Sequence, residues 1–286
     1  MPLMNSGRSA GRSPGRPRIP PRLILAVVVA LVSIGGYFLN SSKNPVTGRT
    51  QQIALSMEQE IALGLQSAPE MARQFGGVSS DPRATDLVKS VGAEIVAALP
   101  PDAPPYRYDF HLLADPQTVN AFALPGGQVF ITTALLTRLE TEGQLAGVLG
   151  HEVGHVLGRH SAQQMAKAQL AQGLAGAAGM AGGDTAMGAQ SAQAVAGMVG
   201  KFLLLKYGRE DELEADRLGL RFMHAAGYDP RSLIGVMKIL EEASGGASAD
   251  RNDFSATHPN PGRRIEVIER TIAEMFPGGV PGGLRP

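Results

Sequence analysis

Two histidines and a glutamate in the middle of the chain have the spacing of a metal-dependent catalytic motif. His151, Glu152 and His155 form a His-Glu-x-x-His sequence inside a small and apolar stretch. Residues four apart share one face of a helix, so both imidazoles can reach a single ion at about 2 Å. Glu152 then lies beside the ion, where a general base acts in metal-assisted hydrolysis. The apolar neighbours indicate a buried helix, in which such polar groups need partners.

A third ligand is available on a charged helix further along the chain. Residues 209–219 hold several acids, and such a run is usually a solvated face. Glu212 and Asp216 stand out because their stripe continues into small and apolar residues and can pack against another helix. Spacing therefore favours Glu212 as a ligand and Asp216 as the acceptor for the second nitrogen of a ligand histidine. Glu210 and Glu214 share the same spacing off this stripe and are the alternatives.

These motifs resemble those of the gluzincin metallopeptidases that include bacterial HtpX, the periplasmic BepA and the CAAX prenyl protease. Four segments carry the resemblance, in the order that the family has them. They are Asn120–Gly127, His151–His155, Glu212–Asp216, and Thr257–Pro259 followed by Arg264. The resemblance implies one zinc ion per chain. The implied ligands are His151, His155 and Glu212, with Glu152 as the base and Asp216 behind a ligand histidine.

The resemblance also implies roles that spacing alone does not mark. His258 matches a histidine that can reach the zinc as a fourth ligand and gate activity in BepA-like relatives; otherwise it is an ordinary loop histidine. Arg264 matches an arginine near the active site, and either residue is a candidate to stabilise the oxyanion. Asn120 and Ala121 precede a strand predicted at 128–133, which we expect to be an edge strand beside the metal. A peptide substrate can add to such an edge; an ordinary hairpin is the alternative.

The remaining histidines and the family differences limit what carries over. His111, His160 and His224 have no ligand spacing, so we expect them to be structural. HtpX and the prenyl protease embed their sites among several spanning helices, and BepA carries a C-terminal repeat domain. This chain has one candidate spanning helix and resembles a minimal member with a single anchor.

The hydrophobic periodicity predicts an α+β fold, with a zinc-binding helical layer packed on a small, mostly antiparallel sheet. Asp81 and Pro82 have the types expected at the start of a helix, as do Asn260 and Pro261. The predicted helices are 57–75, 81–99, 134–140, 143–160, 209–226, 230–244 and 261–275, and the predicted strands are 106–113 and 128–133.

The N-terminal region has the charge pattern of a membrane anchor. Residues 1–57 hold seven of the 26 Lys and Arg and none of the 26 Asp and Glu, so the neutral net charge hides a basic head. The uncharged run Leu23–Leu39 follows five arginines and is long enough for a spanning helix. A poor cleavage site favours an anchor over a signal peptide. The positive-inside rule places the body on the extracytoplasmic side.

Composition completes the predicted organisation. The chain has no cysteine, which excludes disulfides, cysteine-bound zinc and a thiol nucleophile. We expect a disordered region over 1–22, a linker over 40–56, a catalytic domain over 57–276 and a flexible tail over 277–286. The Ala- and Gly-rich residues 171–200 are either a low-complexity insertion or a lid.

The predicted function is that of a zinc-dependent, membrane-anchored endopeptidase in envelope protein quality control. Its expected partners are unfolded or misassembled proteins or peptides and the membrane; no basic patch indicates nucleic acid. We expect the body in the periplasm, anchored or, if the leader is cleaved, released. The alternative function is a zinc-bound chaperone or assembly factor with little proteolytic activity.

Overall fold

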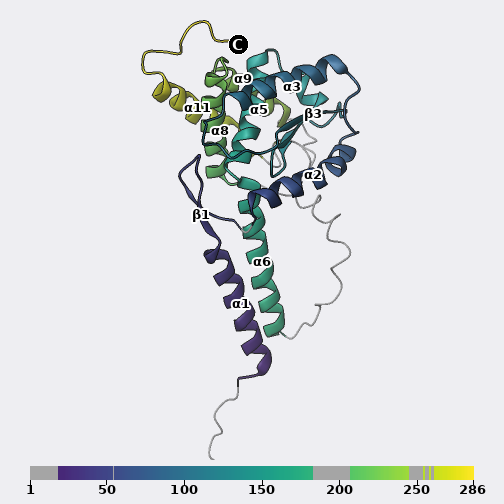
Figure 1. The fold of residues 1–286 in the computed structure, drawn as a ribbon, viewed down its shortest axis with the longest axis vertical. Helices are drawn as coiled ribbons and strands as arrows, with labels where there is room; N and C mark the ends of the chain where they lie inside the picture. The colour runs from purple at the N-terminus through teal and green to yellow at the C-terminus, as the bar shows by residue number, and fades with distance from the viewer. Residues whose placement is uncertain (1–18, 54, 183–206, 245–253, 255–257, 259–260) are drawn as a thin grey trace, which may run out of the picture.

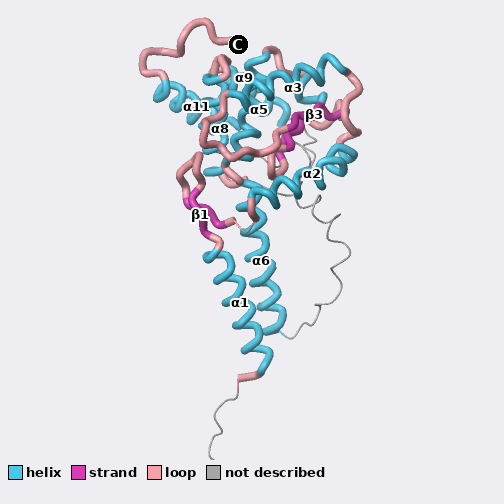
Figure 2. The backbone as a smooth tube through the Cα atoms, viewed as in Figure 1, coloured by secondary structure: helices cyan, strands magenta, loops and turns pink. Residues whose placement is uncertain are grey.

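The structure is a computed structural model that describes residues 19–53, 55–182, 207–244, 254, 258 and 261–286. Two long helices, α1 (Pro21–Leu39) and α6 (His160–Gly182), lie side by side and project as a stalk from a body (Figure 1). The body holds the other helices and a small sheet (Figure 2). This mostly helical arrangement with small sheets agrees with the predicted α+β class.

Seven helices and two sheets build the body in the described part of the chain. The helices are α2 (Met57–Gln74), α3 (Pro82–Ala97), α4 (Thr133–Leu136), α5 (Glu142–Leu157), α8 (Arg209–Ala225), α9 (Ser232–Ser244) and α11 (Pro261–Met275). The strands are β1 (Ser41–Lys43), β2 (Thr50–Gln52), β3 (Asp109–Leu113), β4 (Ala121–Ala123) and β5 (Gln128–Thr132). Ser56 caps α2 and Asp81 caps α3 through their side chains.

The three-stranded sheet is mixed, so the prediction of a mostly antiparallel sheet is wrong. Its order is β3-β5-β4, with β3 parallel to β5 and β4 antiparallel to β5. The strand predicted at the edge, β5, is therefore the central strand, and β4 lies at the edge. The turn at Gly126 and Gly127, with φ of 82° and 109°, folds β4 back onto β5. Because β4 has only three residues, its alternation was too short to reveal a strand in the sequence.

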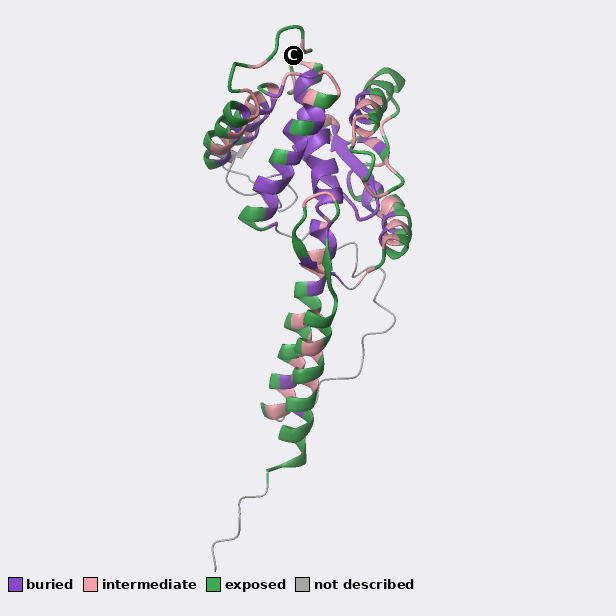
Figure 3. Ribbon diagram, turned by 60° about the vertical axis from the view of Figure 1, so that its left-hand side comes forward, coloured by how far each residue is buried: buried purple, intermediate pink, exposed green. Residues whose placement is uncertain are grey.

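Helix α5 forms the centre of the body. Every residue from Gly143 to Leu157 is buried (Figure 3). It packs against α8, α9, α3 and β4. The contact with α8 is close because it is made by small residues: a Cβ added at Gly154 would lie 2.8 Å from the backbone oxygen of Ala215. This approach brings the histidines of α5 opposite the acids of α8.

The helix predicted over 143–160 is interrupted at Arg159. Helix α5 ends at Leu157, and α6 begins at His160. Arg159 has a φ of 53°, the left-handed region that is costly for a residue with a Cβ. The buried carboxylate of Glu60 holds it there by accepting a 3.0 Å hydrogen bond from Arg159 Nε. The helix is therefore broken directly after the His-Glu-x-x-His motif, and α6 leaves the body as part of the stalk (Figure 1).

The segment expected to be a linker contains a short hairpin that contacts the end of α5. Strands β1 and β2 pair antiparallel. The side-chain amide of Asn44 donates to the carbonyl of Leu157 at 2.7 Å, and that of Gln51 donates to the carbonyl of Gly158 at 2.6 Å. Terminal helix carbonyls lack partners within the helix, so the hairpin caps the end of α5.

The C-terminal residues, expected to form a flexible tail, are attached to the body. The guanidinium of Arg285 lies 4.0 Å from the centre of the Tyr228 ring. The carbonyl of Pro286 accepts a hydrogen bond from the backbone N–H of Gly143 at 2.8 Å. This contact satisfies a donor in the first turn of α5.

Helix α1 is long and apolar enough to cross a membrane, and it is the one such helix among the described residues. Most of its side chains are exposed, including Leu31 at 63% and Val32 at 69%. Of the stretch 171–200, residues 171–182 belong to α6, and the rest lies outside the described residues.

Candidate metal centre

Three potential metal-ligand atoms, referred to below as donors, come together from α5 and α8 in the interior of the body. His151 and His155 are one turn apart on α5, and their Nε2 atoms are 3.0 Å apart. Glu212, on α8, places its carboxylate oxygens 3.7 Å from His151 Nε2 and 3.5 Å from His155 Nε2. All three residues are about 1% exposed. The close packing of α5 on α8 creates this arrangement.

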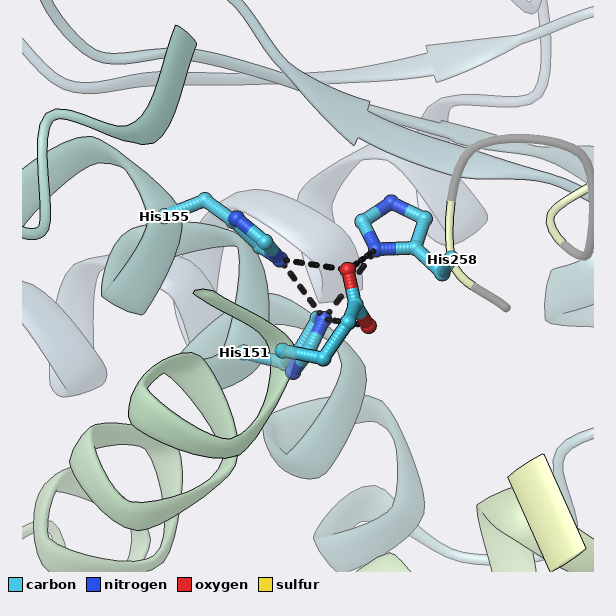
Figure 4. Close-up of side chains that lie close together, drawn as sticks. His151, His155 and His258 are labelled. Atoms are coloured by element: carbon cyan, nitrogen blue, oxygen red, sulfur yellow. Dashed lines mark hydrogen bonds and ion pairs between the residues drawn. The ribbon is translucent and has the colours of Figure 1, made fainter. Parts of the chain in front are cut away.

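A fourth donor comes from His258. Its Nδ1 lies 3.3 Å from His151 Nε2 and 3.0 Å from an oxygen of Glu212, and the residue is fully buried. Figure 4 shows the three histidines His151, His155 and His258 converging on one point. One potential ligand atom from each of the four residues lies within 4.8 Å of every other.

The spacing of these donors fits a single tetrahedral ion. Ligand atoms about 2.0–2.1 Å from a common ion at tetrahedral angles lie about 3.3 Å from one another. The separations given above, with either oxygen of Glu212, are 3.0–3.7 Å and lie around this value. Burial lowers the pKa of His151 and of His155, which favours the uncharged ring that binds metals. Three imidazoles and a carboxylate at these separations fit a metal ion.

Asp216 and Arg264 hydrogen-bond to the candidate ligands from behind: Asp216 contacts His151, and Arg264 contacts Glu212. Asp216 Oδ1 lies 2.9 Å from His151 Nδ1, so Nδ1–H donates to the carboxylate and Nε2 keeps its lone pair. Arg264 Nε donates to Asp216 at 2.8 Å, and Arg264 Nη1 donates to Glu212 at 2.6 Å. Although burial acts to raise it, the pKa of Asp216 is held far below its usual range by Arg264 and His151. Asp216 is therefore a carboxylate that fixes the tautomer of His151.

The carboxylate of Glu152 is buried beside the donors. Glu152 is fully buried, and neither oxygen has a hydrogen-bond partner among the described residues. The nearest charged or ionisable contact is His258 Nε2, 3.6 Å from Oε1. Burial, reinforced by the charge of Glu212, raises the pKa of Glu152 well above its usual range. A buried carboxyl group without a partner is costly, which is typical of a group with a chemical role.

His160, which we expected to be structural, contacts a ligand histidine. Its Nδ1 lies 2.9 Å from His155 Nδ1, and its Nε2 lies 3.0 Å from Glu214. If His155 binds an ion through Nε2, its Nδ1–H donates to His160, which donates in turn to Glu214. Arg49, on the hairpin after α1, completes the chain 3.3 Å from Glu214. Glu214, one alternative third ligand, is therefore turned away from the donors.

Sequence reasoning had no signal for His160, because five positions from His155 is not a helical ligand spacing. The helix break at Arg159 brings the rings of His155 and His160 together. The left-handed backbone conformation of Arg159 cannot be foreseen from residue types. The ring of Tyr207, also not singled out, stacks on His155 with centroids 4.0 Å apart. Its hydroxyl is 2.9 Å from that of Ser161. The two remaining histidines are elsewhere: His111 stacks on Phe130, and His224 meets Phe276 edge to face.

The segment expected to receive substrate lies at the edge of the sheet, on β4. Ala121 is opposite Ile131 of β5, and Asn120 precedes it at 2% exposure. Strand β4 contacts α5, the helix of the metal motif. Phe254 N donates to the carbonyl of Val119 at 3.0 Å, so the segment before His258 contacts the chain at the start of β4.

The arrangement is thus a buried group of three histidines and a glutamate with a second glutamate beside it, the kind of site that metallopeptidases use. Comparison with known proteins agrees. The sequence pattern of peptidase family M48 matches residues 82–272. The chain belongs to peptidase family M48.

Its relatives include proteases of bacteria and mitochondria. The beta-barrel assembly-enhancing protease of Yersinia pestis is 29% identical over 251 residues, which cover 82% of this chain and 48% of that protein. The mitochondrial metalloendopeptidase OMA1 of Saccharomyces cerevisiae is 30% identical over 249 residues, 82% of this chain and 70% of that protein. The corresponding protein of Schizosaccharomyces pombe is 29% identical over 254 residues, 86% of this chain and 71% of that protein. The chain spans about half the length of the bacterial relative.

Proposed function

We propose that this chain is a zinc-dependent endopeptidase, anchored in a membrane by α1, that cleaves unfolded or misassembled proteins. The observation that carries the proposal is the buried group of three histidines and Glu212, with the buried carboxylate of Glu152 beside it. His151, His155 and Glu212 would hold the ion, because imidazole and carboxylate donors at these separations suit zinc. Zinc, when bound, acts as a Lewis acid and lowers the pKa of a water molecule toward neutrality.

The residues around the ion would divide the remaining chemistry among themselves. Glu152 takes the proton of the attacking water and passes it to the leaving amine. Asp216 keeps His151 in the tautomer that presents Nε2. Arg264 holds Glu212 and Asp216 in place; it and His258 are the candidates to stabilise the oxyanion.

An extended substrate would pair with the edge strand β4. Its backbone hydrogen bonds would give affinity that tolerates many sequences. Asn120 and Ala121 stand at the beginning of this strand, and β4 packs on α5 close to Glu152. A substrate bound there runs past the base and the metal ligands.

A second function, a zinc-bound assembly factor with latent activity, is favoured by His258 and Phe254. His258 lies among the donors, in the position of a fourth ligand. Phe254 stacks on it with ring centroids 4.1 Å apart and hydrogen-bonds to Val119 before β4. Phe254 thus links His258 to the chain just before β4, which would suit a closed resting state.

The location follows from the anchor and the charges around it. The basic N-terminal residues would stay in the cytoplasm, which places the body on the periplasmic side. The packing of α6 along α1 supports a retained helix, since a cleaved leader would be lost from this pair. The names of the relatives concern protein assembly and mitochondrial proteolysis, and we propose envelope protein quality control for this chain.

The test compares the full-length protein with its Glu152→Gln variant in detergent. Zinc content and cleavage of casein are measured on the same samples, with Glu58→Gln on the exposed start of α2 as the matched control. We expect equal zinc in all three proteins and loss of cleavage in Glu152→Gln alone. Absence of zinc from the wild type would refute the proposal.

If all three proteins bind zinc and none cleaves casein, His258→Ala separates the two functions. A latent peptidase gains activity when the fourth ligand is removed, and this gain disappears again in the double variant with Glu152→Gln. A chaperone shows no cleavage in either variant.

A further inference from the structure

The surface shared by α1 and α6 is made largely of small side chains. Ala26 of α1 and Ala177 of α6 are buried at 5% and 6% exposure, although both helices project away from the body (Figure 3). A Cβ added at Gly173 would lie 2.2 Å from the hydroxyl of Ser33. Close approach of two helices through small residues is the packing mode of helix pairs in membranes.

Both helices have an uncharged band over the length at which they touch. In α1 the band is Leu23–Leu39, and in α6 it extends from Ala168 to Gly182. At about 1.5 Å per residue, these bands are about 25 Å and 22 Å long. The bands begin at the same level, because Asn40, directly after α1, and Gln169 of α6 line one cavity.

We propose that α6 enters the lipid bilayer together with α1, so that these two helices form a membrane-embedded pair. The inference rests on the proposed anchor. Ser33 lies in the middle of the apolar run, so a bilayer that surrounds α1 must also surround the segment of α6 that touches it. A helix fulfils the bilayer's requirement that every backbone polar group is paired internally.

The outward face of α6 is compatible with acyl chains. Its exposed side chains beyond the level of Gln172 are Leu174, Ala175 and Ala178. Gln172 is polar but uncharged, and Lys167 lies at the body end, where a lipid headgroup would receive it. The α6 helix is less apolar than α1 and does not qualify as a spanning helix by its own composition. The close contact with α1 compensates, because it removes one face of α6 from lipid.

The test uses single cysteines, which the cysteine-free chain allows without further changes. Three full-length variants carry Ala175→Cys on α6, Leu31→Cys on α1 and Ala97→Cys on the exposed surface of α3. Each is reconstituted in phosphatidylcholine–phosphatidylglycerol vesicles made permeable with a pore-forming peptide. Reaction with a water-soluble maleimide is followed before and after denaturation in dodecyl sulfate. Unchanged zinc content shows that each variant is folded.

We expect Ala97→Cys to react at once, and Ala175→Cys and Leu31→Cys to react only after denaturation. Ala175 is exposed in the protein, so only lipid can protect it. If Ala175→Cys reacts as fast as Ala97→Cys while Leu31→Cys is protected, α6 is in water and the inference is wrong, although the anchor stands. If Leu31→Cys reacts as well, both the anchor and the inference fail.

Discussion

Removal of the His160 ring should weaken metal binding although His160 is not a ligand. In the structure, His160 Nδ1 is 2.9 Å from His155 Nδ1, and both residues are almost completely buried. The substitution His160→Ala leaves the Nδ1–H of His155 without an acceptor in a site that excludes water. His155 then loses the partner that holds its ring and its tautomer for ligation through Nε2.

Two independent estimates give the size of the effect. Loss of a partner behind a ligand histidine usually lowers metal affinity about 10–100-fold. A buried donor left without an acceptor costs about 1–3 kcal/mol, and about 1.4 kcal/mol corresponds to a tenfold change. Both estimates predict a zinc Kd about 10–100-fold higher in His160→Ala than in the wild type.

The assay is a competition for zinc between the protein and a chromophoric chelator at constant pH. The matched control is His111→Ala, because His111 contacts Gln128 and Phe130 on the sheet. His160→Gln should recover part of the affinity, since its amide oxygen can accept from His155. A Kd for His160→Ala within about twofold of the control would refute the assignment of His160 as a positioning residue.

Three further predictions test the packing and the charges of the site. Gly154→Ala should lower stability by about 1–3 kcal/mol, because the added Cβ meets the backbone of α8. The control Gly176→Ala should not, because no atom lies within 4 Å of the added Cβ, and thermal unfolding measures both. Arg264→Gln should lower stability by about 3–5 kcal/mol, because it leaves two buried carboxylates uncompensated, and adding Asp216→Asn should restore part of the loss in denaturant titrations. The base must be ionised, and burial raises the pKa of Glu152, so kcat/KM should fall as the pH decreases through a value above the usual 4.3 or so; an acid limb at or below this value contradicts the role.

The central part of the site could be predicted from the sequence because helical spacing determines it. His151 and His155 are placed by their four-residue spacing. The stripe of Glu212 and Asp216, which continues into small and apolar residues, predicts which face of α8 meets α5. The contribution of His258 came through family resemblance alone, since a loop residue has no periodicity.

The rest depended on long-range contacts or on backbone shapes that residue types do not encode. The strand order could not be inferred, because the three-residue β4 lies between β3 and β5 in the sequence but at the edge of the sheet. The hairpin of β1 and β2 looked like a linker in the sequence. It caps α5 through Asn44 and Gln51, and contacts between such distant residues cannot be inferred from residue types. His160 was missed because one left-handed residue, Arg159, redirects the chain.

The helix break at Arg159 places the first residue of α6 against the candidate metal site. The helix has 23 residues, a length of about 34 Å. Its first residue, His160, touches His155, and its far end lies at the depth of the bilayer that α1 would span. In the proposed membrane helix pair, the packing of α6 on α1 sets the tilt of α6. A change in that packing would move the His160 ring against His155, so the packing of the helix pair and the affinity of the protein for its metal would be coupled.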